Sequence, residues 1–167
     1  MELNWMGRYR PLVAALVLHT NILTRGWNNR MDCGDGVFLT PPEWQVLECI
    51  VEHEEGYLNM IEIARQIGIP QSSFSRIVKT LRDDGLIVKY QVAGNRKNVI
   101  LRPSESGRSV YRRMVSNPSR SYFQVFFKEL ESLSDEDIYI FTKALNKFTL
   151  ALPTAKDSQE VKLIEME

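Results

Sequence analysis

A chain of 167 residues has room for one domain with a real core, or for one domain with an added dimerisation element. Its 21 basic and 21 acidic residues cancel, so net charge alone indicates no partner. Two cysteines without a CxxC spacing exclude a disulfide scaffold and most structural zinc sites, and they favour a reducing compartment. The apolar run over 11–18 is too short to span a bilayer. We therefore expect a cytoplasmic protein with no membrane partner.

The first two predicted helices flank a glycine-containing turn. Residues 4–30 have the periodicity of one amphipathic helix, and Gly34-Asp35-Gly36 ends that region. Thr40 and Glu43 form a capping-box pattern that predicts the start of a second helix. We expect that helix to end within 53–56.

A second capping-box pattern, Asn59 with Glu62, precedes a short predicted helix over 60–67. A tight connection at 68–70 then leads into a clearly amphipathic helix over 71–84. Two helices joined by so short a connection predict a helix-turn-helix.

A hairpin is predicted directly after these helices, with a strand over 86–92, a turn at 93–95 and a returning strand over 99–101. A long helical stretch follows over 104–133, and Pro118 inside it predicts a kink. The expected order is therefore three helices, two strands and further long helices.

The last predicted helix starts after Ser134 and carries large apolar residues at alternating spacings of three and four: Ile138, Phe141, Leu145, Phe148 and Leu152. The stretch before it is rich in aromatic residues: Tyr122, Phe123, Phe126 and Phe127. Such a seam suits packing on another helix, and so much apolar surface exceeds what two helices of a small monomer cover. We predict a homodimer whose interface includes Phe126 and the first four seam residues. Packing within one chain is the alternative.

Basic residues gather in the middle of this neutral chain. Between Arg65 and Arg113 there are eleven basic and three acidic residues, a net charge of +8, so the remainder carries −8. A cationic middle is the footprint expected for a polyanionic partner. Long cations on a solvated surface would give the same count.

The predicted helix over 71–84 has two chemically distinct faces. Its apolar positions are spaced for burial: Phe74, Ile77, Val78 and Leu81. The opposite face has hydrogen-bonding residues and long cations, with no acid before Asp83: Gln71, Ser72, Ser75, Arg76 and Lys79, with Ser73 beside them. A recognition helix needs such a face, because its first turns meet base edges while Arg and Lys meet guanine edges or phosphates. Helix capping explains Ser72 or Ser73 about as well.

The hairpin tip predicts a second contact. Asn95, Arg96 and Lys97 place two cations at the tip of a two-stranded ribbon, which can enter a minor groove or lie along phosphates. A solvated tip with incidental charges is the alternative.

Together these motifs resemble the multiple antibiotic resistance regulator (MarR) family of winged-helix repressors. The resemblance covers about residues 8–152 in element order and spacing, and it rests on 58–68, 71–81, 85–87, 94–97, 104–107 and 133–136. It implies an obligate dimer formed by the first and last two helices. In many members, DNA is released when a small phenolic ligand binds or a cysteine is oxidised.

The sequence departs from that pattern in two places. The family's wing commonly has an Asp-Arg pair where this chain has Asn95 before Arg96, so this arginine lacks the aspartate that orients it. The family often has Leu-Thr before its fifth helix, where this chain has Pro103-Ser104.

Other chemistry is sparse, and we expect no enzyme, no catalytic residue, no cofactor and no metal site. His19 is interpreted as structural, but with Trp44 it is also the candidate lining of a pocket for a small aromatic ligand. His53 is interpreted as part of a solvated helix end. Cys49 is expected to be buried. Cys33, in a polar loop, is the better redox candidate, although the adjacent aspartate argues against high reactivity.

We therefore predict a mainly α fold with a small β-hairpin wing, in which dimerisation helices flank a winged helix-turn-helix. The predicted parts are an N-terminal dimerisation helix (1–35), a DNA-binding domain (36–102), C-terminal dimerisation helices (103–153) and a polar tail (154–167). The predicted function is a homodimeric, sequence-specific regulator, expected to repress, that binds a near-palindromic duplex operator. A winged-helix module that binds protein instead of DNA is the alternative.

Overall fold

The computed structural model describes residues 5–56, 59–92, 95–116 and 123–151. The chain divides into two compact units, Met1–Pro118 and Ser119–Glu167. The domain boundaries expected after residues 35 and 102 stay predictions.

The N-terminal segment forms a short 3-10 helix, η1 (Gly7–Tyr9), followed by α1 (Arg10–Gly26). Pro11 lies in the first turn of α1, where its missing N–H would have no partner in any case. The helix expected over 4–30 is shorter than predicted because a turn follows Gly26, whose carbonyl accepts from Asn29 N–H at 2.9 Å. No residue of α1 is buried.

A small hairpin that the sequence did not predict follows α1. Strands β1 (Met31–Asp32) and β2 (Phe38–Leu39) pair antiparallel. The turn between them is built by the expected Gly34-Asp35-Gly36 sequence, all three with positive φ, at 87°, 52° and 75°. Leu39 and Cys33 from this hairpin are fully buried.

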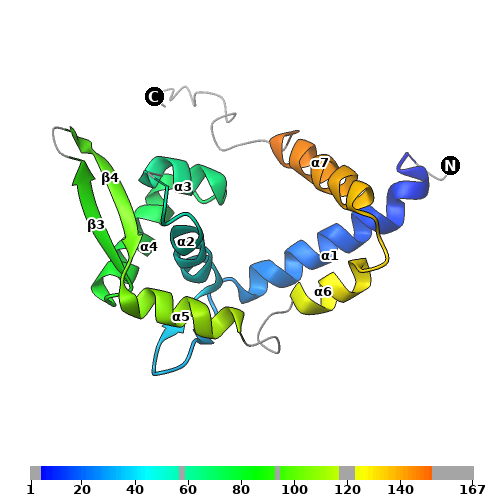
Figure 1. Cartoon of the computed structure of the whole chain (residues 1–167). Coiled ribbons are helices and arrows are strands. Elements are labelled where there is room, and N and C mark those ends of the chain that lie inside the picture. The colour runs from blue at the N-terminus through cyan, green and yellow to red at the C-terminus, as the bar shows by residue number, and fades with distance from the viewer. Residues whose placement is uncertain (1–4, 57–58, 93–94, 117–122, 152–167) are drawn as a thin grey trace, which may run out of the picture. The chain divides into compact units, whose positions relative to one another are not determined.

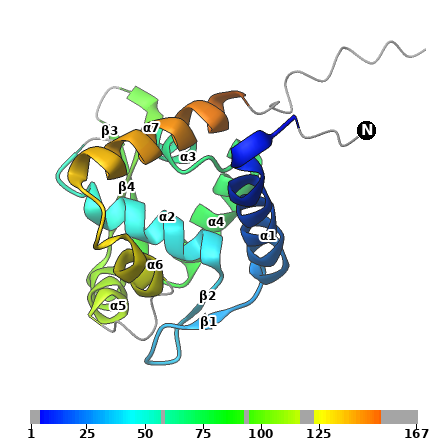
Figure 2. The same ribbon diagram turned by 90° about the vertical axis from the view of Figure 1, so that its right-hand side faces the viewer.

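Helix α2 (Pro41–Glu52) is the central element of the winged helix. Its predicted capping box is confirmed, and Thr40 N–H donates to Glu43 Oε2 at 2.8 Å. Its buried side chains are Val46, Leu47, Cys49 and Ile50. The helix contacts α3, α4, α5, β2 and β4 (Figure 2).

The helix-turn-helix consists of α3 (Met60–Gln66) and α4 (Gln71–Asp83). The capping box before α3 is confirmed, since Asn59 Oδ1 accepts from two backbone N–H groups and Glu62 bonds back to the Asn59 N–H. Gly85, with φ of +71°, follows α4 and allows the chain to leave the helix.

The wing is the antiparallel pair β3 (Ile87–Val92) and β4 (Asn95–Pro103), shown in Figure 1. The returning strand is longer than the predicted 99–101, because Asn95, expected in the turn, already pairs with Val92. A single bridge between Asn59 and Ile100 attaches the start of α3 to the outer side of β4.

The kinked helix expected over 104–133 is instead two helices in different units. The first is α5 (Glu105–Val115) and the second is α6 (Phe123–Leu130). The expected kink at Pro118 lies outside the described residues. The last helix, α7 (Asp135–Ala151), begins after Ser134 as predicted, and the Ser134 hydroxyl accepts from Asp137 N–H at 3.2 Å. The predicted fold class, mainly α with a small β-hairpin wing, is confirmed.

Candidate nucleic-acid interface

Helix α4 separates its side chains as the sequence pattern indicates. Phe74, Val78 and Leu81 are fully buried, and Ile77 packs against the same core. The polar positions Gln71, Ser72, Ser75, Arg76 and Lys79 are exposed, and Ser73 is half-buried. The burial of one face holds the other toward solvent, so the geometry leaves this surface available to a partner.

The start of α4 shows how its serines are used. The N-cap residue is Pro70, which has no side-chain donor or acceptor, and no side-chain capping bond forms there. Ser72 and Ser73 therefore lie inside the first turn and are not the capping residue. Capping does not account for the serines at this helix start.

The cations of α4 differ in their partners. Arg76 is exposed and, within the part of the chain that the structure describes, has no ion pair. Lys79 Nζ lies 2.7 Å from Asp83 Oδ2, and Arg82 Nη2 lies 2.6 Å from Asp83 Oδ1. Hydrogen bonds from Lys79 and then Arg82 hold the pKa of Asp83 below its usual range.

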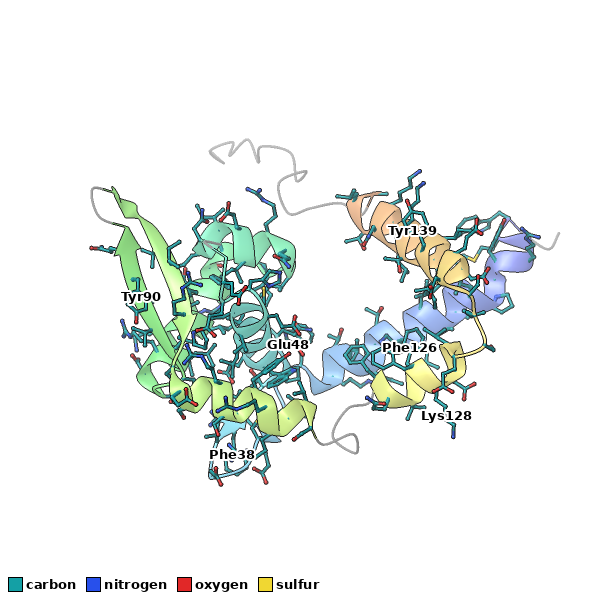
Figure 3. The ribbon with its side chains drawn as sticks, in the orientation of Figure 1. Phe38, Glu48, Tyr90, Phe126, Lys128 and Tyr139 are labelled. Carbon is teal, nitrogen blue, oxygen red and sulfur yellow. The ribbon has the colours of Figure 1, made fainter. Side chains whose placement is uncertain are left out.

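The wing is described at its stem but not at its tip. The backbone of Asn95, Arg96 and Lys97 belongs to β4, while their side chains lie outside the described residues. On β3, Lys89 and Gln91 are exposed, as is the labelled Tyr90 (Figure 3). The predicted contact at the wing tip therefore stays a prediction.

A tight junction fixes the stem of the wing to α5. The Ser104 hydroxyl donates to Gly85 O at 2.6 Å and accepts from Gly107 N–H at 3.0 Å, while Ser104 N–H donates to Leu86 O at 2.9 Å. A Cβ at Gly107 would meet Leu86 O at 2.1 Å. Only glycine allows α5 this close to the backbone that leads from α4 into the wing.

Two of the three arginines of α5 bind partners that are distant in sequence. Arg108 makes a bidentate pair with Glu54 beyond the end of α2, with Nε donating to Oε2 at 2.9 Å. Arg113 donates from Nε to Cys33 O at 2.8 Å and pairs with Asp35, so it holds the β1–β2 turn. Gly34 has φ of +87°, a backbone conformation that favours glycine, and a Cβ there would lie 2.8 Å from Arg113 Nε.

The third arginine of α5 has a local partner. Arg112 Nη2 donates to Glu105 Oε1 at 2.8 Å within the same helix, and both side chains are exposed. All three arginines of α5 therefore have carboxylate partners. Two of these partners, Glu54 and Asp35, lie outside the stretch over 65–113, so the charge count of that stretch overstated its free positive charge.

Trp44 and Tyr111 join α2 to α5. Their rings stack with centroids 6.0 Å apart and planes at 12°, and the Tyr111 hydroxyl donates to Glu52 Oε1 at 3.1 Å. Burial, followed by the bond to Glu52, raises the pKa of Tyr111. His19, the other residue expected in a ligand pocket, lies exposed on α1.

A hollow lies between the end of α2 and α3, lined by Gln45, Glu48, Cys49, Glu52, His53, Gln66 and Ile67. Neither Trp44 nor His19 is among the lining residues. Burial, and then the neighbouring Glu52 carboxylate, raises the pKa of Glu48. Within the described residues, no group of three or more His, Cys, Asp and Glu side chains is arranged to hold a metal ion.

His53 and Glu54 do not form the solvated helix end that the sequence predicts. His53 Nδ1 lies 3.0 Å from Cys49 O, and its Nε2 lies 3.2 Å from Gln66 Nε2 on α3. Glu54 is held by Arg108. The end of α2 is therefore a structural junction with α3 and α5.

The two cysteines are both buried and free of disulfides. Cys49 is buried as expected, and burial followed by the Glu52 and Glu48 carboxylates raises the pKa of its thiol. Cys33 was expected in a polar loop, but its exposed fraction is 0% because the hairpin turns it into the core. This burial argues against Cys33 as a redox sensor, since oxidant sensing needs an accessible thiolate.

Large apolar residues remain exposed on α1, α6 and α7, each taken by itself. No residue of these three helices is buried. Phe126 on α6 and Tyr139 on α7 carry exposed side chains (Figure 3), as does Phe148. Three seam positions are half-buried: Ile138, Phe141 and Leu145. Leu152 and Tyr122 lie outside the described residues. None of the helices in the described ranges has the length and apolar character that crossing a bilayer requires.

Sequence reasoning missed the contacts that join α5 to the end of α2. The pairs Arg108–Glu54 and Tyr111–Glu52 join residues more than fifty positions apart, and no local pattern indicates them. The short spacing of Ser104 and Gly107 was visible as a helix start, but the contact with Gly85 was not.

Comparison with known proteins gives an independent view of the same region. Residues 39–97 match the MarR family. A curated relative, the HTH-type transcriptional regulator PchR of Bacillus subtilis (strain 168), is 26% identical over 107 residues. This match covers 64% of the present chain and 62% of PchR.

Solved structures extend the similarity to most of the chain. PcaV, a transcriptional regulator from Streptomyces coelicolor solved with its natural ligand, matches with a TM-score of 0.58 and 19% identity. That match covers 87% of this chain and 95% of PcaV. Streptococcus pneumoniae FabT, solved in complex with DNA, matches with a TM-score of 0.57 and 17% identity, covering 85% of this chain and 95% of FabT. At these identities the likeness establishes the fold alone.

Proposed function

We propose that this chain, which matches the MarR family over residues 39–97, is a sequence-specific DNA-binding regulator of transcription. The observation that carries the proposal is the outward face of α4. It combines exposed Gln71, Ser72, Ser75 and Arg76 on a helix whose first turn contains no acid and whose opposite face is buried. Such a helix presents hydrogen-bonding groups to base edges and cations to guanine or phosphate.

We assign base reading to the start of α4 and backbone contact to its later turns and the wing. Arg76 has no ion pair among the described residues, so binding DNA would not require it to leave a carboxylate. The proposal places Arg96 in the minor groove outside the major-groove contact, with Asn95 beside it and Lys97 near the backbone. The similarity of the fold to FabT, which was solved with DNA, supports this mode of binding.

We further propose that two copies bind together. The support is the large apolar side chains that lie exposed on α1, and separately on α6 and α7, including Phe126 and Phe148. A two-fold dimer places its recognition helices about one DNA turn apart, so the operator would be a near-palindrome of roughly 16–20 base pairs. Sedimentation at micromolar concentration is expected to give a dimer, and a monomer would contradict this part of the proposal.

Repression, with release by a small aromatic ligand, completes the proposal. PcaV, which shares the fold, was solved with its natural ligand, and this supports a search for an effector. His19 and Trp44 are the residues we propose to test first. A compound that binds this chain should release it from DNA, and the release should weaken in Trp44→Ala.

The experiment that tests the function is selection of binding sites from random duplex DNA. We expect an enriched near-palindromic sequence that binds with an affinity falling steeply as salt rises, because phosphate contacts release counterions. A winged helix that binds protein would enrich no sequence and show no salt-dependent DNA binding. That outcome would contradict the proposal.

A further inference from the structure

One carboxylate on α4 is shared by two of the helix's three cations. Lys79 Nζ lies 2.7 Å from Oδ2 of Asp83, whereas Arg82 bonds the other oxygen, Oδ1, through Nε at 3.0 Å and Nη2 at 2.6 Å. Each oxygen of Asp83 therefore has its own cation. The lowered pKa of Asp83 agrees with this arrangement, since both hydrogen bonds favour the charged carboxylate.

The position of these groups matters for DNA binding. Lys79 lies eight residues after Gln71, about 12 Å further along the helix axis. Base edges are read by the first turns of a recognition helix, so Lys79 lies where the helix meets the phosphate backbone. The Lys79 side chain is 71% exposed and Asp83 is 42% exposed. An exposed pair of this kind is weak, and a phosphate can replace the carboxylate.

We propose that Asp83 is a specificity-determining residue, which holds Lys79 and Arg82 away from DNA until a phosphate in the correct position replaces it. This inference rests on the proposed DNA-binding function. It assigns to an acidic residue of the recognition helix a role in rejecting the wrong DNA.

Operator and random DNA should differ in how well they compete with Asp83. On the operator, base contacts made by the start of α4 fix the helix in one register, so the same phosphate stays beside Lys79. On random DNA the helix has no fixed register, so no single phosphate stays beside Lys79. The Asp83 carboxylate then competes with phosphates for Lys79 more effectively. Asp83 therefore lowers the affinity for random DNA more than the affinity for the operator.

Asp83→Asn tests the inference because it keeps the side-chain shape and removes the charge. Asp84→Asn is the matched control, because Asp84 is the adjacent exposed C-cap residue, takes no part in these bonds, and loses the same charge. We expect Asp83→Asn to raise affinity for random DNA roughly two- to fivefold per recognition helix, and operator affinity by less. Asp84→Asn should raise both affinities equally and by a smaller factor.

A double-mutant cycle with Lys79→Ala isolates the bond itself. When Asp83 is present, Lys79→Ala should weaken binding to random DNA only slightly. In the Asp83→Asn background the same change should cost more, because Lys79 is then free to bind phosphate. Circular dichroism of each variant checks the fold, and Asp83→Ser replaces Asp83→Asn if that variant fails to fold.

The outcomes separate this inference from the proposed function. If the unaltered protein shows no salt-dependent DNA binding, the function itself fails. If it binds but Asp83→Asn behaves like Asp84→Asn, or if the effect of Lys79→Ala is the same in both backgrounds, Asp83 has no role in specificity. The inference is supported if the ratio of operator affinity to random-DNA affinity falls in Asp83→Asn and not in Asp84→Asn.

Discussion

Helices α4 and α5 each carry three basic residues, but these residues have different partners. On α5, Arg108 and Arg113 bind groups more than fifty positions away in sequence and fix that helix to the rest of the fold. On α4, Arg76 has no ion pair among the described residues, and Lys79 and Arg82 share one carboxylate of their own helix. A cationic stretch of sequence can therefore contain both structural and surface cations, which only tertiary contacts distinguish.

The close contact between α5 and the backbone that leads into the wing should contribute most to stability. Gly107→Ala should lower the free energy of unfolding by about 3 kcal/mol, because its Cβ would meet Leu86 O at 2.1 Å and force the backbones apart. Urea denaturation measures this. Gly26→Ala is the control, since the nearest atom to its Cβ would be 3.9 Å away. Equal unfolding free energies for the two variants would show that the junction is not tight.

Arg76→Ala should lower the affinity for DNA while leaving the stability of the protein nearly unchanged. It should cost roughly 1–3 kcal/mol of operator affinity and less on random DNA, because a base contact is lost. Its unfolding free energy should stay within about 0.5 kcal/mol of the unaltered protein, since the side chain is exposed. Fluorescence anisotropy with both duplexes measures the affinities. Equal losses on operator and random DNA would remove Arg76 from base recognition.

Arg96→Ala tests whether the wing contacts DNA, as α4 is proposed to do. It should erase a preference for A·T-rich flanks and reduce the slope of log affinity against log salt by about one unit per half-site. Footprinting on the operator with and without the substitution shows whether flank protection is lost. Protection confined to one half-site, unchanged by Arg96→Ala, would contradict both the wing contact and the symmetric dimer.

Removing Arg108 should lower the stability of the protein more than removing Arg112. Arg108→Ala should lower the thermal midpoint measurably, because Glu54 would lose its bidentate partner, whereas Arg112→Ala should change it little because its pair with Glu105 is exposed. Differential scanning calorimetry compares them. A larger loss in Arg112→Ala would reverse the assignment of structural and surface cations.

The smallest effect is the pH dependence of the same pair. The hydrogen bond from Arg108 lowers the pKa of Glu54 below its ordinary value of 4.5. A carboxylate whose pKa is lower in the folded protein stabilises the fold above 4.5, and this contribution disappears as the pH falls through the folded pKa. The stability difference between the unaltered protein and Glu54→Gln should therefore be greatest near neutral pH and shrink in acid. A difference that does not vary with pH would show that the ionisation of Glu54 does not contribute to stability. Glu55→Gln serves as the control.

The sequence predicted those elements whose formation depends on residues close together in the chain. The capping boxes at Thr40 and Asn59, and the buried stripe that includes Phe74, were recognised because each depends on residues within one or two turns. The β1–β2 hairpin was missed because its strands have two residues each, too few for an alternating pattern. Cys33 was misplaced for the same reason.

The candidate site was predictable in its composition but not in its electrostatics. The exposed face of α4 followed from the spacing of its apolar residues. The bonds of Asp83 with Lys79 and Arg82 involve near neighbours, but rotamers decide whether they form. The long-range partners of Arg108 and Arg113 required the fold itself.

The most direct test of the account is a salt titration of DNA binding on the selected operator with three proteins: unaltered, Arg76→Ala and Arg112→Ala. We expect steep, linear loss of log affinity with log salt for the unaltered protein. Arg76→Ala should bind more weakly at every salt concentration, and Arg112→Ala should follow the unaltered protein because Arg112 lies on α5, outside the helix and wing proposed to contact DNA. Affinity that does not depend on salt, or equal losses in the two variants, would contradict the assignment of α4 as the DNA-reading helix.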